Sequence, residues 1–139
     1  MVESLSAHMQ AAGLGEAEQA RNLNAVRSFI DEYFAKDWGP AQLEARIGEA
    51  VDWAKANGIP VGRLVMGEFG AILMSTDGRM GAFNADRLRY LEAVRLAAET
   101  HNIPWAIWEY ANPYGMSVIA ASGPAVPDRE LLRAIGLAQ

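Results

Sequence analysis

Two acidic residues that close apolar stretches of the sequence are the residues best placed to do chemistry. Glu68 lies in the Gly-Glu-Phe-Gly motif of residues 67–70, directly after the apolar run of residues 59–66, and Glu109 closes a second apolar run, residues 103–108. A carboxylate at the end of a buried strand can act as a nucleophile or exchange a proton as a general acid or base. Catalytic groups of parallel α/β barrels lie at the carboxyl ends of the strands. We therefore expect both acids at one barrel-type site.

The second apolar run also carries two tryptophans, Trp105 and Trp108. Three positions apart on a strand, they point to opposite faces, so only one of them can line a site. An indole face packs well against the C–H groups of a sugar ring. The segment after this strand adds a polar and aromatic cluster able to hydrogen-bond hydroxyl groups, formed by Glu109, Tyr110, Asn112 and Tyr114.

The glycines that flank Glu68 have a structural use in this interpretation. Gly67 and Gly70 let the backbone bend at the strand end and leave room for a ligand. Metal binding and cofactor binding are not predicted. His8 and His101 are far apart, and zinc, calcium-loop, P-loop and dinucleotide motifs are absent from the sequence.

Helical patterns surround the two apolar runs. Leu23, Val26, Ile30 and Phe34 predict a helix over residues 16–36. The other predicted helices run from Pro40 to Asn57-Gly58, from an Asn84 cap to His101-Asn102, and from an Asp128 cap over residues 129–135.

The element order and the continuous apolar runs predict an α/β fold with parallel strands covered by helices. Two strands leave long unpaired edges, so we expect an incomplete (β/α)8 TIM barrel, its last two strands with flanking helices. In this division residues 1–15 are a loose N-terminus, 16–38 a helical insertion, and 40–137 the last strands and helices of the barrel.

Composition narrows the class of protein. The chain of 139 residues is 51% hydrophobic and 21% charged, as in a globular domain, and its net charge of −5 argues against a nucleic-acid partner. It has no cysteine, no apolar run long enough to cross a bilayer, and no signal peptide at its N-terminus.

The motifs resemble the C-terminal portion of glycoside hydrolase family 5 cellulases. The similarity covers roughly residues 40–137 and rests on Ile59-Pro60, on the motif of residues 67–70, and on Ile103-Pro104 followed by the Trp-x-x-Trp of residues 105–108. In that family the seventh barrel strand ends in such a motif holding the nucleophile, and the second tryptophan of the eighth strand floors the subsite of the cleaved sugar.

The resemblance implies a retaining endoglucanase-like hydrolase acting on β-1,4-glucan, with Glu68 as nucleophile and Trp108 as sugar platform. We expect Glu109, Tyr110 and Asn112 as further substrate-binding residues. The family's Asn-Glu acid/base dipeptide and its His-x-Tyr are absent from this sequence. We therefore expect a fragment that is inactive alone, unless Glu109 substitutes as the acid. The family further implies a secreted or periplasmic parent protein.

Two alternatives remain open. The chain could be a non-catalytic α/β interaction module that forms a homodimer, with two half-barrels completing each other in place of a missing N-terminal half. The other alternative is a member of the same family that acts on mannan or xylan. The loops that distinguish the hydroxyl groups of these sugars are mostly absent from this chain, so the sequence does not choose among the substrates.

Overall fold

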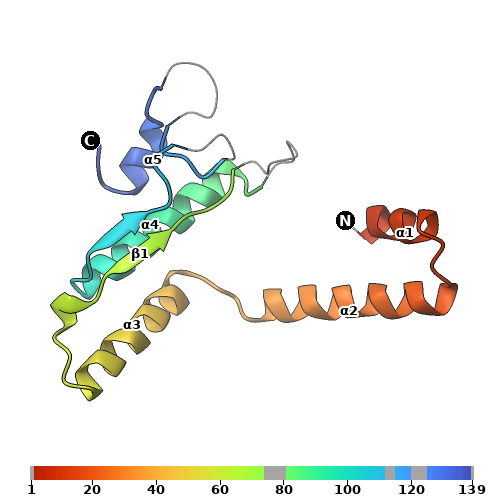
Figure 1. The fold of residues 1–139 in the computed structure, drawn as a ribbon, viewed down its shortest axis with the longest axis horizontal. Coiled ribbons are helices and arrows are strands. Elements are labelled where there is room, and N and C mark those ends of the chain that lie inside the picture. The colour runs from red at the N-terminus through yellow and green to blue at the C-terminus, as the bar shows by residue number, and fades with distance from the viewer. Residues whose placement is uncertain (1, 74–80, 112–114, 120–124, 139) are drawn as a thin grey trace. The chain divides into compact units, whose positions relative to one another are not determined.

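The structure of the chain, a computed structural model, describes residues 2–73, 81–111, 115–119 and 125–138 and divides into two compact units, Met1–Trp38 and Gly39–Gln139. The first unit contains helices α1 (Val2–Ala11) and α2 (Glu16–Ala35). The second contains α3 (Pro40–Ala56), the 3-10 turn η1 (Val61–Arg63), β1 (Met66–Phe69), α4 (Asn84–Thr100), β2 (Trp105–Ile107) and α5 (Arg129–Ala134) (Figure 1).

The first unit is a helical hairpin. Residues 1–15, expected as a loose N-terminus, contain helix α1, and Gly13 follows the helix with a φ of +73°. The N–H of Gly13 donates to the carbonyl of Gln10 (3.0 Å) and that of Leu14 to Met9 (3.1 Å). Gly13 thus terminates the helix in the left-handed conformation that glycine favours.

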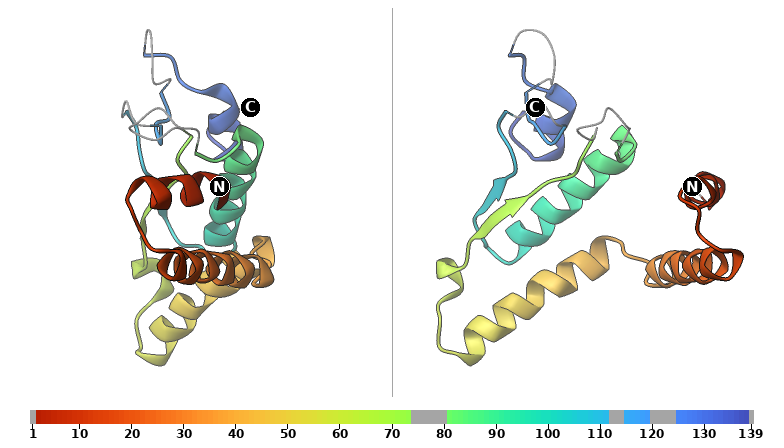
Figure 2. Two further views of the ribbon diagram at one scale, coloured as in Figure 1. Left: turned by 90° about the vertical axis from the view of Figure 1, so that its right-hand side faces the viewer. Right: turned by 45° about the vertical axis from the view of Figure 1, so that its right-hand side comes forward.

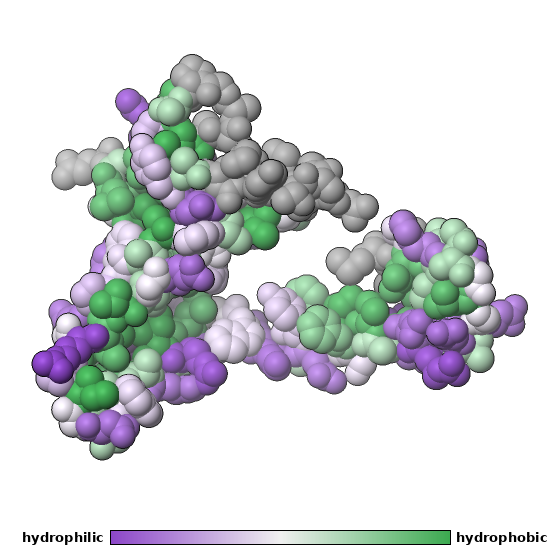
Figure 3. Space-filling view, in the orientation of Figure 1, coloured by the Kyte–Doolittle hydropathy of each residue, from purple (hydrophilic) through white to green (hydrophobic). Residues whose placement is uncertain are grey.

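Helix α2 matches its predicted bounds and, apart from Phe34, its predicted apolar face. Leu23, Val26 and Ile30 are half-buried as expected, whereas Phe34 is exposed. No residue of α2 is buried within this unit. Hydrophobic side chains therefore lie at the surface along α2 (Figure 3).

In the second unit, local signals place α3 and the end of α4 where the sequence predicts them. Pro40 occupies the first turn of α3, and the N–H of Gly39 donates to the Gln42 side chain (3.0 Å). Gly58, at φ +67°, follows the helix. At the end of α4, Asn102 has φ +56° and the N–H of Ile103 donates to the carbonyl of Ala98 (2.9 Å).

The start of α4 differs from its prediction. Asn84 is the first helical residue rather than the cap, and Phe83, in the cap position, makes no side-chain cap bond. The Asn84 amide instead donates to Glu130 Oε2 on α5 (3.1 Å). Asp128 does cap α5 as predicted, since its Oδ1 accepts from the N–H groups of Glu130 and Leu131 at 3.0 and 3.1 Å.

The two strands are parallel neighbours, which confirms the predicted pairing. The strand predicted over the apolar run of residues 59–66 is wrong in its position, because residues 61–63 form η1 and β1 begins only at Met66. Pro60 and Gly62 within the apolar run favour this turn over a strand. Among the described residues, only β1 and β2 form a sheet.

Helix α4 is the centre of the second unit and contributes to both of its cores. One buried cluster joins Phe69 of β1 to α4, α5 and the segment before α5, and is formed by Phe69, Leu91, Val94, Val118, Leu131 and Ile135. The other joins α3 to the end of α4 through Val51, Ala98 and Ile103. Figure 2 shows β1 and β2 side by side along α4, with their carboxyl ends towards α5.

Candidate functional site

Glu68 is exposed near the carboxyl end of β1 because the strand carries one extra residue. Met66 pairs with Trp105 and Phe69 pairs with Ile107, so two residues of β1 lie opposite one residue of β2. In a regular strand Glu68 would share a face with Met66, which packs against the core. The irregularity puts Phe69 in the core instead and leaves Glu68 exposed. Bulges of this kind re-aim side chains beside active sites.

The ends of the two strands are held together by their backbones. The N–H of Trp108 donates to the carbonyl of Phe69 (2.8 Å), and a Cβ on Gly70 would overlap the carbonyl oxygen of Trp108. The space that the sequence assigns to a ligand at Gly70 is thus taken by the Trp108 backbone. A methyl side chain at Gly67 would meet no atom within 4 Å, so that glycine is not needed for space.

The two tryptophans of the second motif have different surroundings. Trp105 packs against both hydrophobic clusters, meets the Phe69 ring edge-on at 5.6 Å, and donates from Nε1 to Glu99 (3.3 Å). Trp108 follows β2, lies outside both clusters and is 48% exposed. Of the pair, Trp108 is the one available to a ligand.

The remaining predicted binding residues follow Trp108. The Trp108–Glu109 peptide bond is cis. Glu109 is half-buried, and its carbonyl accepts from the N–H of Val118 (2.9 Å). Tyr110 is exposed, and its carbonyl accepts from Ile119 (3.2 Å). Asn112, the last predicted binding residue, lies outside the described residues.

Arg87 was not among the predicted site residues, yet it connects the segments that follow both strands. Its side chain is 2% exposed; Nε donates to the carbonyl of Ala71 (3.1 Å), Nη2 to that of Ser117 (3.3 Å), and Nη1 lies 3.6 Å from Asp128 Oδ2. Burial lowers the pKa of the Arg87 guanidinium, and Asp128 opposes this shift. The sequence held one sign that Arg87 is buried. It lies four residues before Leu91, and therefore on the apolar face of α4.

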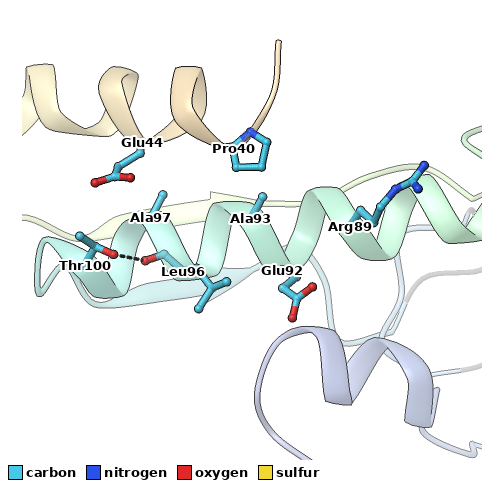
Figure 4. A pocket seen from close by; sticks show the side chains of 8 residues that line it. All are labelled: Pro40, Glu44, Arg89, Glu92, Ala93, Leu96, Ala97 and Thr100. Atoms are coloured by element: carbon cyan, nitrogen blue, oxygen red, sulfur yellow. Dashed lines mark hydrogen bonds between the residues drawn. The ribbon is translucent and has the colours of Figure 1, made fainter.

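A cavity of about 310 Å³ lies elsewhere, between α3 and α4 (Figure 4). Alanines 93 and 97 form part of its wall, while Glu44, Arg89 and Glu92 supply charge. None of the predicted site residues lines it, so the exposed strand ends, and not this cavity, define the candidate site.

Metal-ligand clusters and membrane-spanning helices are both absent from the described part of the chain. The histidines, aspartates and glutamates of that part form no group of three or more able to hold a metal ion. Of the helices described, none combines the length and the apolar character needed to cross a membrane.

The fold and the site define an α/β protein with an acid and an aromatic at the ends of neighbouring parallel strands. No family model matches the chain. The sequence is 32% identical to Endoglucanase 3 of Fibrobacter succinogenes over 91 residues, which are 66% of this chain and 12% of that protein. The chain thus spans a small part of this relative.

Parts of two solved structures share the fold of most of this chain. A hyperthermophilic endo-β-1,4-glucanase superposes with a TM-score of 0.54 and 26% identity over 73% of this chain and 29% of its own. Cellulose synthase subunit Z of Clostridioides difficile gives a TM-score of 0.56 and 28% identity over 70% and 28%. The chain is therefore related to cellulases of the glycoside hydrolase family 5 type, which confirms the resemblance predicted from its motifs.

Proposed function

We propose that the chain provides the nucleophile and a sugar platform of a retaining glycoside hydrolase that cleaves β-1,4-glucan. The observation that carries this proposal is the exposure of Glu68 near the carboxyl end of β1, next to the parallel strand that Trp108 follows. Relatedness to endoglucanases supports the choice of substrate class. A secreted or periplasmic location is part of the same proposal.

In the proposed reaction, the Glu68 carboxylate attacks the anomeric carbon of the sugar. A bond forms between a carboxylate oxygen and that carbon while the glycosidic C–O bond breaks, and the leaving oxygen takes its proton from a second carboxyl group. Water later displaces Glu68 from the glycosyl intermediate. Retaining enzymes place the two carboxyl groups about 5–5.5 Å apart.

The second carboxyl group is the part that this chain does not supply in the proposal. The sequence holds no Asn-Glu dipeptide, the family context of the acid/base. Glu109, half-buried after β2, is the substitute acid that the sequence suggests, and nothing else in the chain supports that role. We therefore propose that the chain alone does not turn over natural polysaccharide.

Sugar binding in the proposal uses the residues that follow β2. The exposed indole of Trp108 would stack against a pyranose ring, where the C–H groups of the sugar meet its face. Tyr110, Glu109 and Asn112 would hydrogen-bond the sugar hydroxyls. Substrates with mannose or xylose units remain a variant of this proposal, to be separated by a panel of oligosaccharides.

In this proposal the second unit corresponds to the last two strands of a (β/α)8 barrel with their flanking helices. A parallel sheet of two strands has an unpaired edge on each side, whereas a barrel closes eight strands into a ring. The length of the endoglucanases that match, of which this chain spans 28–29% in the solved structures, supports the view that other strands complete the barrel.

The nucleophile can be tested without a second acid. A 2-deoxy-2-fluoro-β-cellobioside with a 2,4-dinitrophenolate leaving group needs no protonation, and its fluorine slows hydrolysis of the adduct. We expect a covalent adduct on the peptide that contains Glu68, read by mass spectrometry, and none in Glu68→Gln. Glu92→Gln, an exposed acid on α4, is the matched control and should still be labelled.

Carboxymethyl-cellulose tests the rest of the proposal. The folded chain should show no turnover of this polymer. Labelling of another acid would refute the role of Glu68, and turnover lost in Glu68→Ala would show that Glu109 or a second copy supplies the acid.

A second candidate function is a non-catalytic interaction module, favoured by the two unpaired edges of the described sheet. Two copies could pair their open edges and form a homodimer. Light scattering after size-exclusion chromatography at several concentrations tests this directly. A monomer at every concentration would exclude the dimer, while a dimer with a cooperative thermal transition and no cellobioside adduct would favour it over the hydrolase.

A further inference from the structure

Arg87 is a buried cation in the first turn of α4. Only 2% of its side chain is exposed, although ordinary arginines lie at the surface. Its three nitrogens face three separate segments: the carbonyl of Ala71, the carbonyl of Ser117 and the carboxylate of Asp128. One rigid side chain therefore joins the residues after β1, the residues after β2 and the start of α5.

Each of these partners is close in sequence to a residue of the candidate site. Ala71 comes three residues after Glu68. Ser117 precedes Val118, whose N–H donates to the carbonyl of Glu109, the residue next to Trp108. A direct bond between the same two segments, from the Leu73 N–H to the Gly115 carbonyl (2.7 Å), reinforces this connection.

We propose that Arg87 is a positioning residue that holds the segments bearing Glu68 and Trp108 in one fixed arrangement. Its role in ligand binding rests on the proposed function, but its effect on the position of Trp108 does not. Stability alone is a poor reason for the cation, because well-packed apolar side chains often replace a buried ion pair without loss. A planar guanidinium donates in several fixed directions, which lysine cannot reproduce.

Fluorine NMR on the full chain labelled with 5-fluorotryptophan tests the proposal. The four tryptophans give one resonance each, and Trp108→Phe assigns the one of interest. In Arg87→Lys we expect the Trp108 resonance to shift or broaden while those of Trp38 and Trp53 stay in place. Titration with cellotetraose should also show a dissociation constant raised roughly tenfold, because the segments bearing Glu68 and Trp108 would no longer be held in one arrangement.

The matched control is Arg95→Lys. Arg95 lies on the same helix, donates from Nε to the Ala134 carbonyl (3.1 Å) and pairs with Glu99, but it contacts neither segment after the strands. Its replacement should lower the melting temperature without moving the Trp108 resonance. If Arg87→Lys behaves in the same way, Arg87 is merely structural and the proposal is overturned.

A second variant covers the case in which Arg87→Lys does not fold. Asp128→Asn retains a good helix cap and removes only the charge facing Arg87, so the Trp108 resonance should shift from its position in the unaltered chain while those of Trp38 and Trp53 stay in place. An unshifted Trp108 in folded Asp128→Asn would then reject the proposal. Failure of cellotetraose to move Trp108 in the unaltered chain would count against the proposed function alone.

Discussion

The carbonyl oxygen of Trp108 occupies the space that a side chain on Gly70 would need. Any Cβ at this position would overlap backbone rather than the flexible end of a side chain. Because the N–H of Trp108 also donates to the carbonyl of Phe69, the two strands cannot separate locally without losing that bond. Close approach of backbones here depends on a residue without a side chain.

Gly70→Ala should therefore destabilise the second unit by about 1–3 kcal/mol, the usual cost of overpacking. Gly67→Ala, on the same strand, is the control, because a methyl group there meets nothing within 4 Å. Urea denaturation of both variants measures the difference in the free energy of unfolding. Equal stability of the two variants would show that the strand ends separate easily.

Trp108→Ala should weaken binding of cellotetraose roughly tenfold or more, since burying a large aromatic side chain against a ligand contributes about 1.5–3 kcal/mol. Trp53→Ala on α3 is the matched control, because Trp53 is 57% exposed and Trp108 48%. Isothermal titration calorimetry gives both dissociation constants. Equal losses in both variants would mean that sugar does not bind specifically at the strand ends.

Leu91→Ala should cost about 2–5 kcal/mol of stability, because Leu91 is 1% exposed and its removal leaves a cavity among Phe69, Val94 and Leu131. Leu96→Ala on the same helix should cost about 0.5 kcal/mol or less, since Leu96 is 47% exposed. Thermal unfolding followed by near-UV circular dichroism compares the two. A small loss in Leu91→Ala would place the core of the second unit elsewhere.

Asp128→Ala should destabilise the second unit more than Asp128→Asn. Both variants lose the charge opposite buried Arg87. Alanine also loses the cap of α5, worth about 0.5–2 kcal/mol, whereas asparagine keeps it. Chemical denaturation of both variants measures the order. The reverse order would show that the cap does not contribute as described, since both variants lose the charge opposite Arg87.

Sequence signals of short range anticipated much of the fold. Helix α3 starts at Pro40 and ends before Gly58 as predicted, and Asp128 caps α5, because caps and terminators act within a few residues of the helix end. The same range explains the error in the first unit. Residues 1–15 carry too few such signals to predict α1, although Gly13 follows that helix.

The sequence by itself predicted the residues of the candidate site, an acid and an indole that close two apolar runs. Tertiary structure alone decided how they are presented. The extra residue of β1 that exposes Glu68, the contact of Gly70 with Trp108 and the burial of Arg87 all depend on segments distant in sequence. Strand register and the partners of a buried charge are set by long-range packing, which periodicity along one segment does not encode.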